Sequence, residues 1–151
     1  MPLLDQEKYD KVVEKGKEAV TAIKSQDVET FIQKAEEGWD KFPEPKNTWN
    51  QGYNYAKMVF KHLLDHRRFD EAKIWLNRMI DNNNTLNLFD REVTFYAGKY
   101  YFEKGEYKNA LQKWQEVVSD TGFRYFESEK KEYLDFYNNP DKLLKDERTA
   151  S

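Results

Sequence analysis

The sequence predicts an all-α protein, and three observations support this class. Hydrophobic residues recur three and four positions apart through most of the chain, which is the spacing of one helix face. Only six glycines and four prolines interrupt 151 residues, and the prolines (Pro2, Pro43, Pro45, Pro140) lie at candidate helix ends. Charged residues supply 35% of the chain while the net charge is only −3, as expected for the solvated faces of amphipathic helices.

The first predicted pair of helices covers about residues 5–43. Its first helix runs from Asp5 to Lys24, and Ser25-Gln26-Asp27 supplies a turn and a cap for the next helix. The second helix ends at Phe42-Pro43, because proline cannot continue a helix. The apolar positions at helical spacing are Tyr9, Val12, Val13, Ala19, Val20 and Ile23, then Val28, Phe31, Ile32, Ala35 and Trp39.

The second predicted pair covers about residues 48–82. Thr48 and Gln51 have the spacing of a capping box, in which two side chains satisfy orphan amides at a helix start. The turn contains His66-Arg67-Arg68, and the second helix ends in a run of asparagines. The apolar positions are Tyr53, Ala56, Val59, Phe60, Leu63 and Leu64, then Ala72, Ile74, Trp75, Leu76, Met79 and Ile80.

The third predicted pair covers about residues 87–119 and is interrupted at Lys104-Gly105-Glu106. Gly98 and Ala110 are small, so we expect the two helices to cross closely there. The pattern resembles the tetratricopeptide repeat (TPR), which runs roughly W-x2-L-G-x2-Y, then A-x3-F, then P, over about 34 residues. The matching residues are Gly98, Tyr101, Gly105, Tyr107, Ala110 and Trp114. Ala72 and Ala110 occupy equivalent positions, 38 residues apart.

Residues from about 123 to 140 form a predicted cap, because a helical stack must cover the exposed face of its last repeat. The polar tail, residues 141–151, is expected to fray. The resemblance implies one TPR-like domain over residues 1–151. It would consist of three antiparallel helical hairpins in a right-handed α-solenoid, closed by a C-terminal capping helix.

The sequence gives little support for catalysis. The absence of cysteine excludes disulfides and thiolate nucleophiles. His62 and His66 have a spacing that suits two metal ligands, but no third ligand is evident, and a histidine at a helix C-terminus is the alternative interpretation of His66. Paired carboxylates such as Glu36-Glu37 are common on solvated faces, and no phosphate-binding loop or nucleophile elbow occurs. We expect no enzyme activity, no catalytic residue, no metal and no cofactor.

Charge and hydropathy narrow the classes of partner. Only the second pair is net positive, by two charges, so we expect no nucleic-acid partner, whose phosphates require clustered cations. No stretch approaches the roughly 18 apolar residues of a transmembrane helix, and the first residues lack a signal-peptide pattern. We expect a cytoplasmic location, no membrane contact and a protein partner.

In the TPR family, the first helices of successive hairpins line a concave groove. Carrying the groove positions over places Asn54, Lys57, Lys61 and Leu64 of the second pair, and Glu92, Phe95, Lys99 and Phe102 of the third, in that groove. We predict Phe95 and Phe102 as anchors, because aromatic residues are enriched at interface hot spots. The alternative is that the C-terminal segment folds back and buries both. Lys57, Lys61 and Lys99 suit an acidic partner.

The small, acidic, cysteine-free helical repeats and the aromatic run from Tyr133 to Tyr137 also resemble the TPR-like immunity proteins of bacteria. This resemblance implies a non-catalytic module that binds and occludes a cognate secreted toxin. The alternative is a TPR-type adaptor or secretion chaperone that binds a peptide segment of its partner. The predicted partner-binding residues are Asn54, Lys57, Lys61, Phe95, Lys99, Phe102, Tyr133 and Tyr137.

Overall fold

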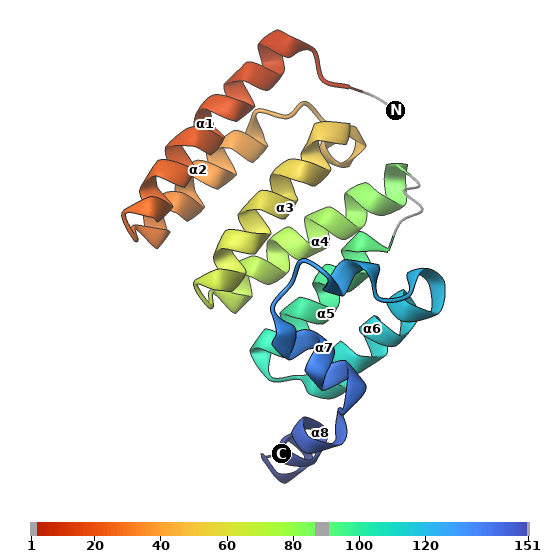
Figure 1. Ribbon diagram of the computed structural model, residues 1–151. Coiled ribbons are helices and arrows are strands. Elements are labelled where there is room, and N and C mark those ends of the chain that lie inside the picture. Colours follow the sequence, from red (N-terminus) through yellow and green to blue (C-terminus); the bar gives the residue numbers. More distant parts are fainter. Residues whose placement is uncertain (1–2, 87–90, 151) are drawn as a thin grey trace. The chain divides into compact units, whose positions relative to one another are not determined.

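The computed structural model of the protein describes residues 3–86 and 91–150 (Figure 1). Eight α-helices and two short 3-10 helices form the regular structure of these residues, and no strand occurs among them. The prediction of an all-α protein is therefore confirmed. The chain divides into two compact units, Met1–Leu88 (unit 1) and Phe89–Ser151 (unit 2). Whether they form a single domain stays a prediction.

Unit 1 contains four α-helices, and the two in each successive pair pack against one another (Figure 1). They are α1 (Gln6–Lys24), α2 (Val28–Asp40), α3 (Asn50–Asp65) and α4 (Phe69–Leu86), with the 3-10 helix η1 (Lys46–Thr48) before α3. The α2 helix stops before Pro43, as predicted. The Lys46 ammonium group donates to the carbonyls of Trp39, Asp40 and Phe42 at 3.4, 3.2 and 2.7 Å, and so satisfies orphan groups at this helix end.

The predicted capping box at the start of α3 is not formed. Trp49 is the N-cap residue and makes no side-chain cap, while the Thr48 hydroxyl donates to the Pro45 carbonyl at 2.7 Å. The Gln51 amide instead bonds the backbone of Leu4, accepting from its N–H at 3.1 Å and donating to its carbonyl at 3.3 Å. A long-range partner has therefore replaced the local one.

Unit 2 contains the remaining elements, and α5 packs against α6 (Figure 1). They are α5 (Glu92–Lys104), α6 (Tyr107–Thr121), the 3-10 helix η2 (Arg124–Phe126), α7 (Lys131–Asn138) and α8 (Asp141–Ala150). The tail predicted to fray forms α8, and its Glu147 carboxylate accepts from the Lys108 amide at 3.2 Å near the start of α6. The predicted start of the third pair, at Asn87, lies outside the described residues.

The same tight turn joins α1 to α2, α3 to α4 and α5 to α6. One residue in each turn has a left-handed conformation, namely Gln26 (φ 63°), Arg67 (φ 57°) and Gly105 (φ 89°). The amide of that residue donates to the carbonyl three residues earlier, and the following amide donates to the carbonyl five residues before it. This is the Schellman arrangement of a helix C-terminus. When the left-handed residues are taken as equivalent, equivalent positions on α1 and α3 are 41 residues apart, and those on α3 and α5 are 38 residues apart.

The core of unit 1 is built around Tyr55. Its hydroxyl donates to the Ala35 carbonyl at 2.7 Å, and burial raises the pKa of the Tyr55 phenol well above its ordinary value, so the group stays neutral. A Cβ atom at Gly38 would overlap the Tyr55 hydroxyl, so only glycine fits at this point of α2. Three other aromatic rings pack around Tyr55: Trp39, Phe42 and Trp75.

Unit 2 repeats this arrangement around Trp114. The indole Nε1 donates to the Phe95 carbonyl at 3.1 Å, and a Cβ atom at Gly98 would overlap that nitrogen. Gly98 therefore makes room for the Trp114 indole, and the predicted close crossing of the two backbones at Gly98 and Ala110 stays a prediction. The rings in contact with Trp114 are Phe95, Phe102, Phe126, Tyr133 and Phe136.

The C-terminal segment covers the face of α5 that was expected to line a groove. Phe95 is only 2% exposed and Phe102 only 9%. The Phe102 ring centroid lies 5.1 Å from that of Tyr133. Lys99 Nζ lies 2.9 Å from Glu129 Oε1, with 11% and 18% of the two side chains exposed. The expectation that Phe95, Lys99 and Phe102 face a groove is therefore wrong, and burial by the C-terminal segment, the alternative, is found. Tyr133 is buried in the same cluster.

We predict that Gly38→Ala destabilises unit 1 by about 1–3 kcal/mol, because the new methyl group forces the Tyr55 hydroxyl away from the Ala35 carbonyl. Gly16→Ala is the matched control. Its Cβ would lie 3.4 Å from Tyr55 Cε2, an ordinary contact, and alanine in a helix interior is favoured over glycine by roughly 0.5–1 kcal/mol. Urea unfolding followed by circular dichroism measures both changes. Equal stability of the two variants would contradict this role of Gly38.

We predict that Phe102→Ala weakens the packing of α7 on α5 by about 3–5 kcal/mol, the usual cost of removing a buried phenylalanine side chain. The amides of Lys131–Asn138 should then exchange with solvent faster in hydrogen-exchange mass spectrometry. Gln112→Ala, at an exposed position of α6, should leave their exchange unchanged. Unchanged protection in Phe102→Ala would show that α7 is held in place by other contacts.

Candidate functional site

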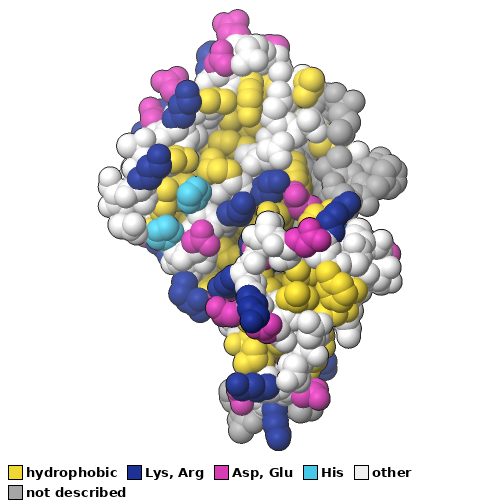
Figure 2. All heavy atoms as spheres, viewed as in Figure 1, with side chains coloured by type: hydrophobic (Ala, Val, Ile, Leu, Met, Phe, Trp, Pro, Cys, Tyr) yellow, Lys and Arg dark blue, Asp and Glu magenta, His cyan; other side chains and the backbone are white. Residues whose placement is uncertain are grey.

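A cavity of about 550 Å³ lies in unit 1 between α1 and α3. Figure 2 shows hydrophobic side chains in this region, bordered by lysine and arginine side chains on the same face. The residues that line the cavity are Tyr9, Val13, Gly16, Lys17, Val20, Thr21 and Lys24 of α1, and Asn54, Tyr55 and Met58 of α3. We call this cavity, together with the adjoining one described below, the α1/α3 groove.

The apolar face of α1 is wider than a single helix contact can cover. The uncovered part of this face forms one wall of the groove. The fully buried apolar side chains of α1 are Val12, Ala19 and Ile23. Tyr9, Val13 and Val20 are only half-buried and line the groove. The periodicity predicted all six as one core face, so these three groove residues were missed. An apolar face as wide as that of α1 is the feature of the sequence that could have indicated a second, groove-lining surface on this helix.

The floor of the groove is formed where Gly16 of α1 meets Tyr55 and Met58 of α3. The Gly16 position lies closest to α3, since a Cβ atom there would be 3.4 Å from Tyr55 Cε2 and 3.9 Å from Met58 Cε. Tyr55 is held in place by its hydrogen bond to the Ala35 carbonyl. Met58 has an unbranched and polarisable side chain, which adapts to differently shaped ligands. A fixed aromatic ring thus lies beside an adaptable methionine.

A second cavity of about 340 Å³ adjoins the first along α3. It is lined by Asn54, Lys57, Met58, Lys61, His62 and Asp65, and Asn54 and Met58 line both cavities. The structure therefore brings together Asn54, Lys57 and Lys61, three of the residues predicted from the sequence to bind a partner.

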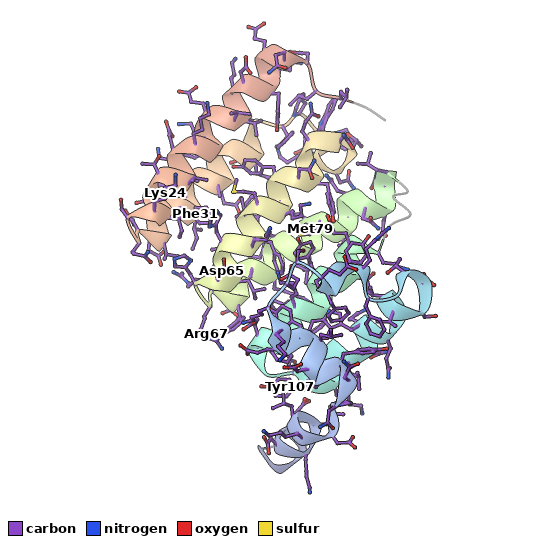
Figure 3. All side chains as sticks on the ribbon, viewed as in Figure 1. Lys24, Phe31, Asp65, Arg67, Met79 and Tyr107 are labelled. Carbon is purple, nitrogen blue, oxygen red and sulfur yellow. The ribbon has the colours of Figure 1, made fainter. Side chains whose placement is uncertain are left out.

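The border of the groove is positively charged. Lys17 and Lys24 come from α1, and Lys57 and Lys61 come from α3. The Lys57 ammonium group lies 5.7 Å from the centroid of the Tyr53 ring. Within the described residues, Lys17, Lys24 and Lys61 form no ion pair. Asp65 is the one acidic residue among those lining the two cavities, so a positive potential remains at the border. Figure 3 shows Lys24 and Asp65 at the C-terminal ends of α1 and α3.

His62 forms part of the groove wall, and its ring meets that of Phe31 edge to face at 5.4 Å. Burial lowers the pKa of His62, opposed by the Asp65 carboxylate and reinforced by His66 and Lys61. Both ring nitrogens of His66 lie within hydrogen-bond distance of protein oxygens. Among the residues that the structure describes, no three histidine, aspartate or glutamate side chains are grouped closely enough to hold a metal ion.

Tyr137, the last of the predicted partner-binding residues, lies in unit 2 and is half-buried. Its ring contacts Phe123 at 5.6 Å and Phe126 at 5.9 Å. Phe123 is 46% exposed and was not predicted as a site residue. The two rings form a small exposed aromatic surface, separate from the buried Tyr133.

No protein-family model matches the chain, and the comparisons with curated proteins and with solved structures found no match. Within residues 3–86 and 91–150, no helix combines the length and the apolar character needed to cross a bilayer. Function is therefore inferred from the α1/α3 groove.

We predict that unit 1 loses stability as the pH falls through the range below about 6.5. The folded pKa of His62 lies below its ordinary value of 6.5, so the unfolded chain binds the proton more readily, and stability present above that value is lost on acidification. His62→Gln should reduce the difference in urea midpoint between pH 7.5 and pH 5.5. His66→Gln removes only the contribution of His66 to the lowered pKa of His62 and leaves the burial of His62 in place, so it should reduce this difference less. An identical pH dependence in wild type and His62→Gln would contradict the prediction.

Proposed function

We propose that the protein is a non-catalytic protein-interaction module and that unit 1 binds a segment of a partner protein in the α1/α3 groove. The observation that carries this proposal is an apolar floor between two helices, bordered by four lysines. We also propose that the three helical pairs are TPR-like hairpins of a right-handed α-solenoid with α7 in the capping position. The recurrence of one turn geometry at spacings of 41 and 38 residues supports this architecture.

The apolar floor favours a partner that brings hydrophobic side chains. Tyr9, Val13, Val20 and Met58 are all half-exposed, and covering apolar surface releases roughly 25 cal/mol for each Å² removed from water. A protein segment, folded or in the course of folding, supplies hydrophobic side chains that can cover this floor. The lysines at the border then select acidic partners and speed their association.

A nucleic-acid partner fits this groove less well. Binding of single strands uses several aromatic side chains on which successive bases stack. Of the two tyrosines that line the groove, Tyr55 is buried, which leaves only Tyr9 half-exposed. Binding of duplexes relies on many clustered cations that contact phosphates. Here the lysines stand at the edges of an apolar floor, an arrangement suited to an amphipathic segment.

The groove favours the adaptor or secretion-chaperone role, because an elongated groove accepts a segment of a partner. The toxin-immunity role predicted from the sequence stays a prediction. Its expected interface on Phe95, Lys99, Phe102 and Tyr133 is replaced by the α1/α3 groove, since those residues are buried.

The proposal is tested with Val20→Glu and Lys61→Glu, which place a negative charge in the floor and at the border. Wild type and variants are used to capture proteins from native lysate, and a protein enriched by wild type is purified and titrated by calorimetry. We expect each variant to bind it at least about tenfold more weakly, because Val20→Glu places an unpaired charge in the apolar floor and Lys61→Glu reverses a charge at the border.

Lys11→Glu is the matched control, because it makes the same charge change on an exposed part of α1 that does not line the groove. It should bind like wild type. Undiminished binding by Val20→Glu and Lys61→Glu would reject the groove as the binding site, and loss of binding in Phe123→Ala alone would move the site to unit 2.

A further inference from the structure

We propose that the α1/α3 groove takes an acidic helix bearing aromatic side chains, of the kind that unit 2 supplies to its own α5. The inference deepens the proposed function and rests on it, because it names the chemistry of the segment that the groove binds. It follows from a comparison of equivalent positions in the two units.

The repeated turns define those positions. With the left-handed residues Arg67 and Gly105 aligned, Lys61 of α3 corresponds to Lys99 of α5. With Gln26 aligned as well, both correspond to Val20 of α1. In unit 2 this position is covered by the C-terminal segment, whereas in unit 1 Val20 and Lys61 line cavities.

The cover in unit 2 shows which side chains such a face accepts. Glu129 places its carboxylate 2.9 Å from the Lys99 ammonium group, and both side chains are largely buried. On α7, which begins two residues after Glu129, the ring centroids of Tyr133 and Phe136 lie 5.1 and 5.4 Å from that of Phe102. Tyr133 and Phe136 lie three positions apart on α7 and project to one side of it, while Glu129 lies in the bend that precedes this helix.

The groove of unit 1 presents the same kinds of group to solvent. Lys61 is exposed and forms no ion pair within the described residues, whereas Lys99 at the equivalent position is paired with Glu129. The half-buried Val13, Val20 and Met58 offer an apolar surface to aromatic rings. The residues equivalent to Phe102 are Ile23 and Leu64, which are buried, so rings in the groove would contact neighbouring positions instead. A carboxylate on Lys61 with aromatic rings in the 550 Å³ cavity would combine the same two kinds of contact that the C-terminal segment makes in unit 2.

Length and charge specify the occupant further. The α1 wall extends from Tyr9 to Lys24, a distance of about 22 Å at 1.5 Å per residue, which matches a helix of about four turns. Lys17 and Lys24 lie on the side opposite Lys57 and Lys61, so acidic residues on both flanks of the occupant would be paired. These features describe an acidic amphipathic helix with aromatic residues on its apolar face.

The test uses a synthetic peptide with the sequence of residues 123–138, which contains Glu129, Tyr133 and Phe136. The full chain carries [13C]methyl-methionine, and its methyl resonances are followed by NMR during titration. Met58 lines the groove, while Met79 is fully buried in unit 1. We expect a saturable shift of the Met58 resonance and a stationary Met79 resonance. Binding of the peptide at unit 2, by displacement of α7, would leave both unchanged and would overturn the proposal.

Charge exchange provides the matched controls. A peptide with Glu129→Lys should bind wild type at least about tenfold more weakly, Lys61→Glu should weaken binding of the native peptide similarly, and combining the two changes should restore affinity. Lys11→Glu should bind the native peptide like wild type. Equal binding of native and Glu129→Lys peptides would overturn the proposed pairing with Lys61.

The outcomes separate the two levels of inference. If a partner protein binds through the groove but the peptide leaves Met58 unshifted, the chemistry of the occupant is wrong and the proposed function stands. If neither partner capture nor the peptide depends on Val20 and Lys61, the groove is not a binding site and both proposals fail.

Discussion

The left-handed residue that ends the first helix of each pair determines where the second helix begins and which positions of the three pairs are equivalent. The backbone hydrogen bonds around Gln26, Arg67 and Gly105 fix where the next helix begins. Only glycine adopts this conformation without steric cost, which is about 1–2 kcal/mol for other residues. Side-chain contacts offset that cost at the other two turns, since Gln26 Oε1 lies 3.2 Å from His66 Nε2 and the Arg67 guanidinium lies 5.0 Å from the Phe69 ring. The equivalence of helix positions, and hence the comparison of an open face with a covered one, depends on these turns.

Local sequence physics predicted the helical class, the pairing of helices and several boundaries. Proline and glycine have distinctive backbone preferences, so the end of α2 before Pro43 and the turn at Gly105 were predictable. The left-handed geometry at Arg67 was not, because arginine carries no such preference and only the surrounding hydrogen bonds impose it. The capping box failed for the same kind of reason. Gln51 has a better partner in Leu4, which is distant in sequence.

The candidate site was harder to predict, because packing over long sequence distances decides which apolar faces stay open. Lys61 and Lys99 have the same helix position and similar neighbours, yet the first lines a cavity and the second is buried with Glu129. The difference arises from a segment some thirty residues beyond Lys99 in the chain. On α1, Tyr9 and Val20 have the spacing of core residues, so periodicity alone assigned them to the core.

The closure of unit 2 over Trp114 also has a consequence for synthesis on the ribosome. The α5 and α6 helices emerge before the residues that cover them, because Phe126, Tyr133 and Phe136 follow in the sequence. A nascent chain folds from its N-terminus at the pace of translation. Until residue 136 has left the exit tunnel, the ring of Phe102 is covered by Tyr107 and Trp114 but not yet by Tyr133 and Phe136. The newborn chain therefore presents, for a short time, an aromatic surface of the kind that cellular chaperones recognise.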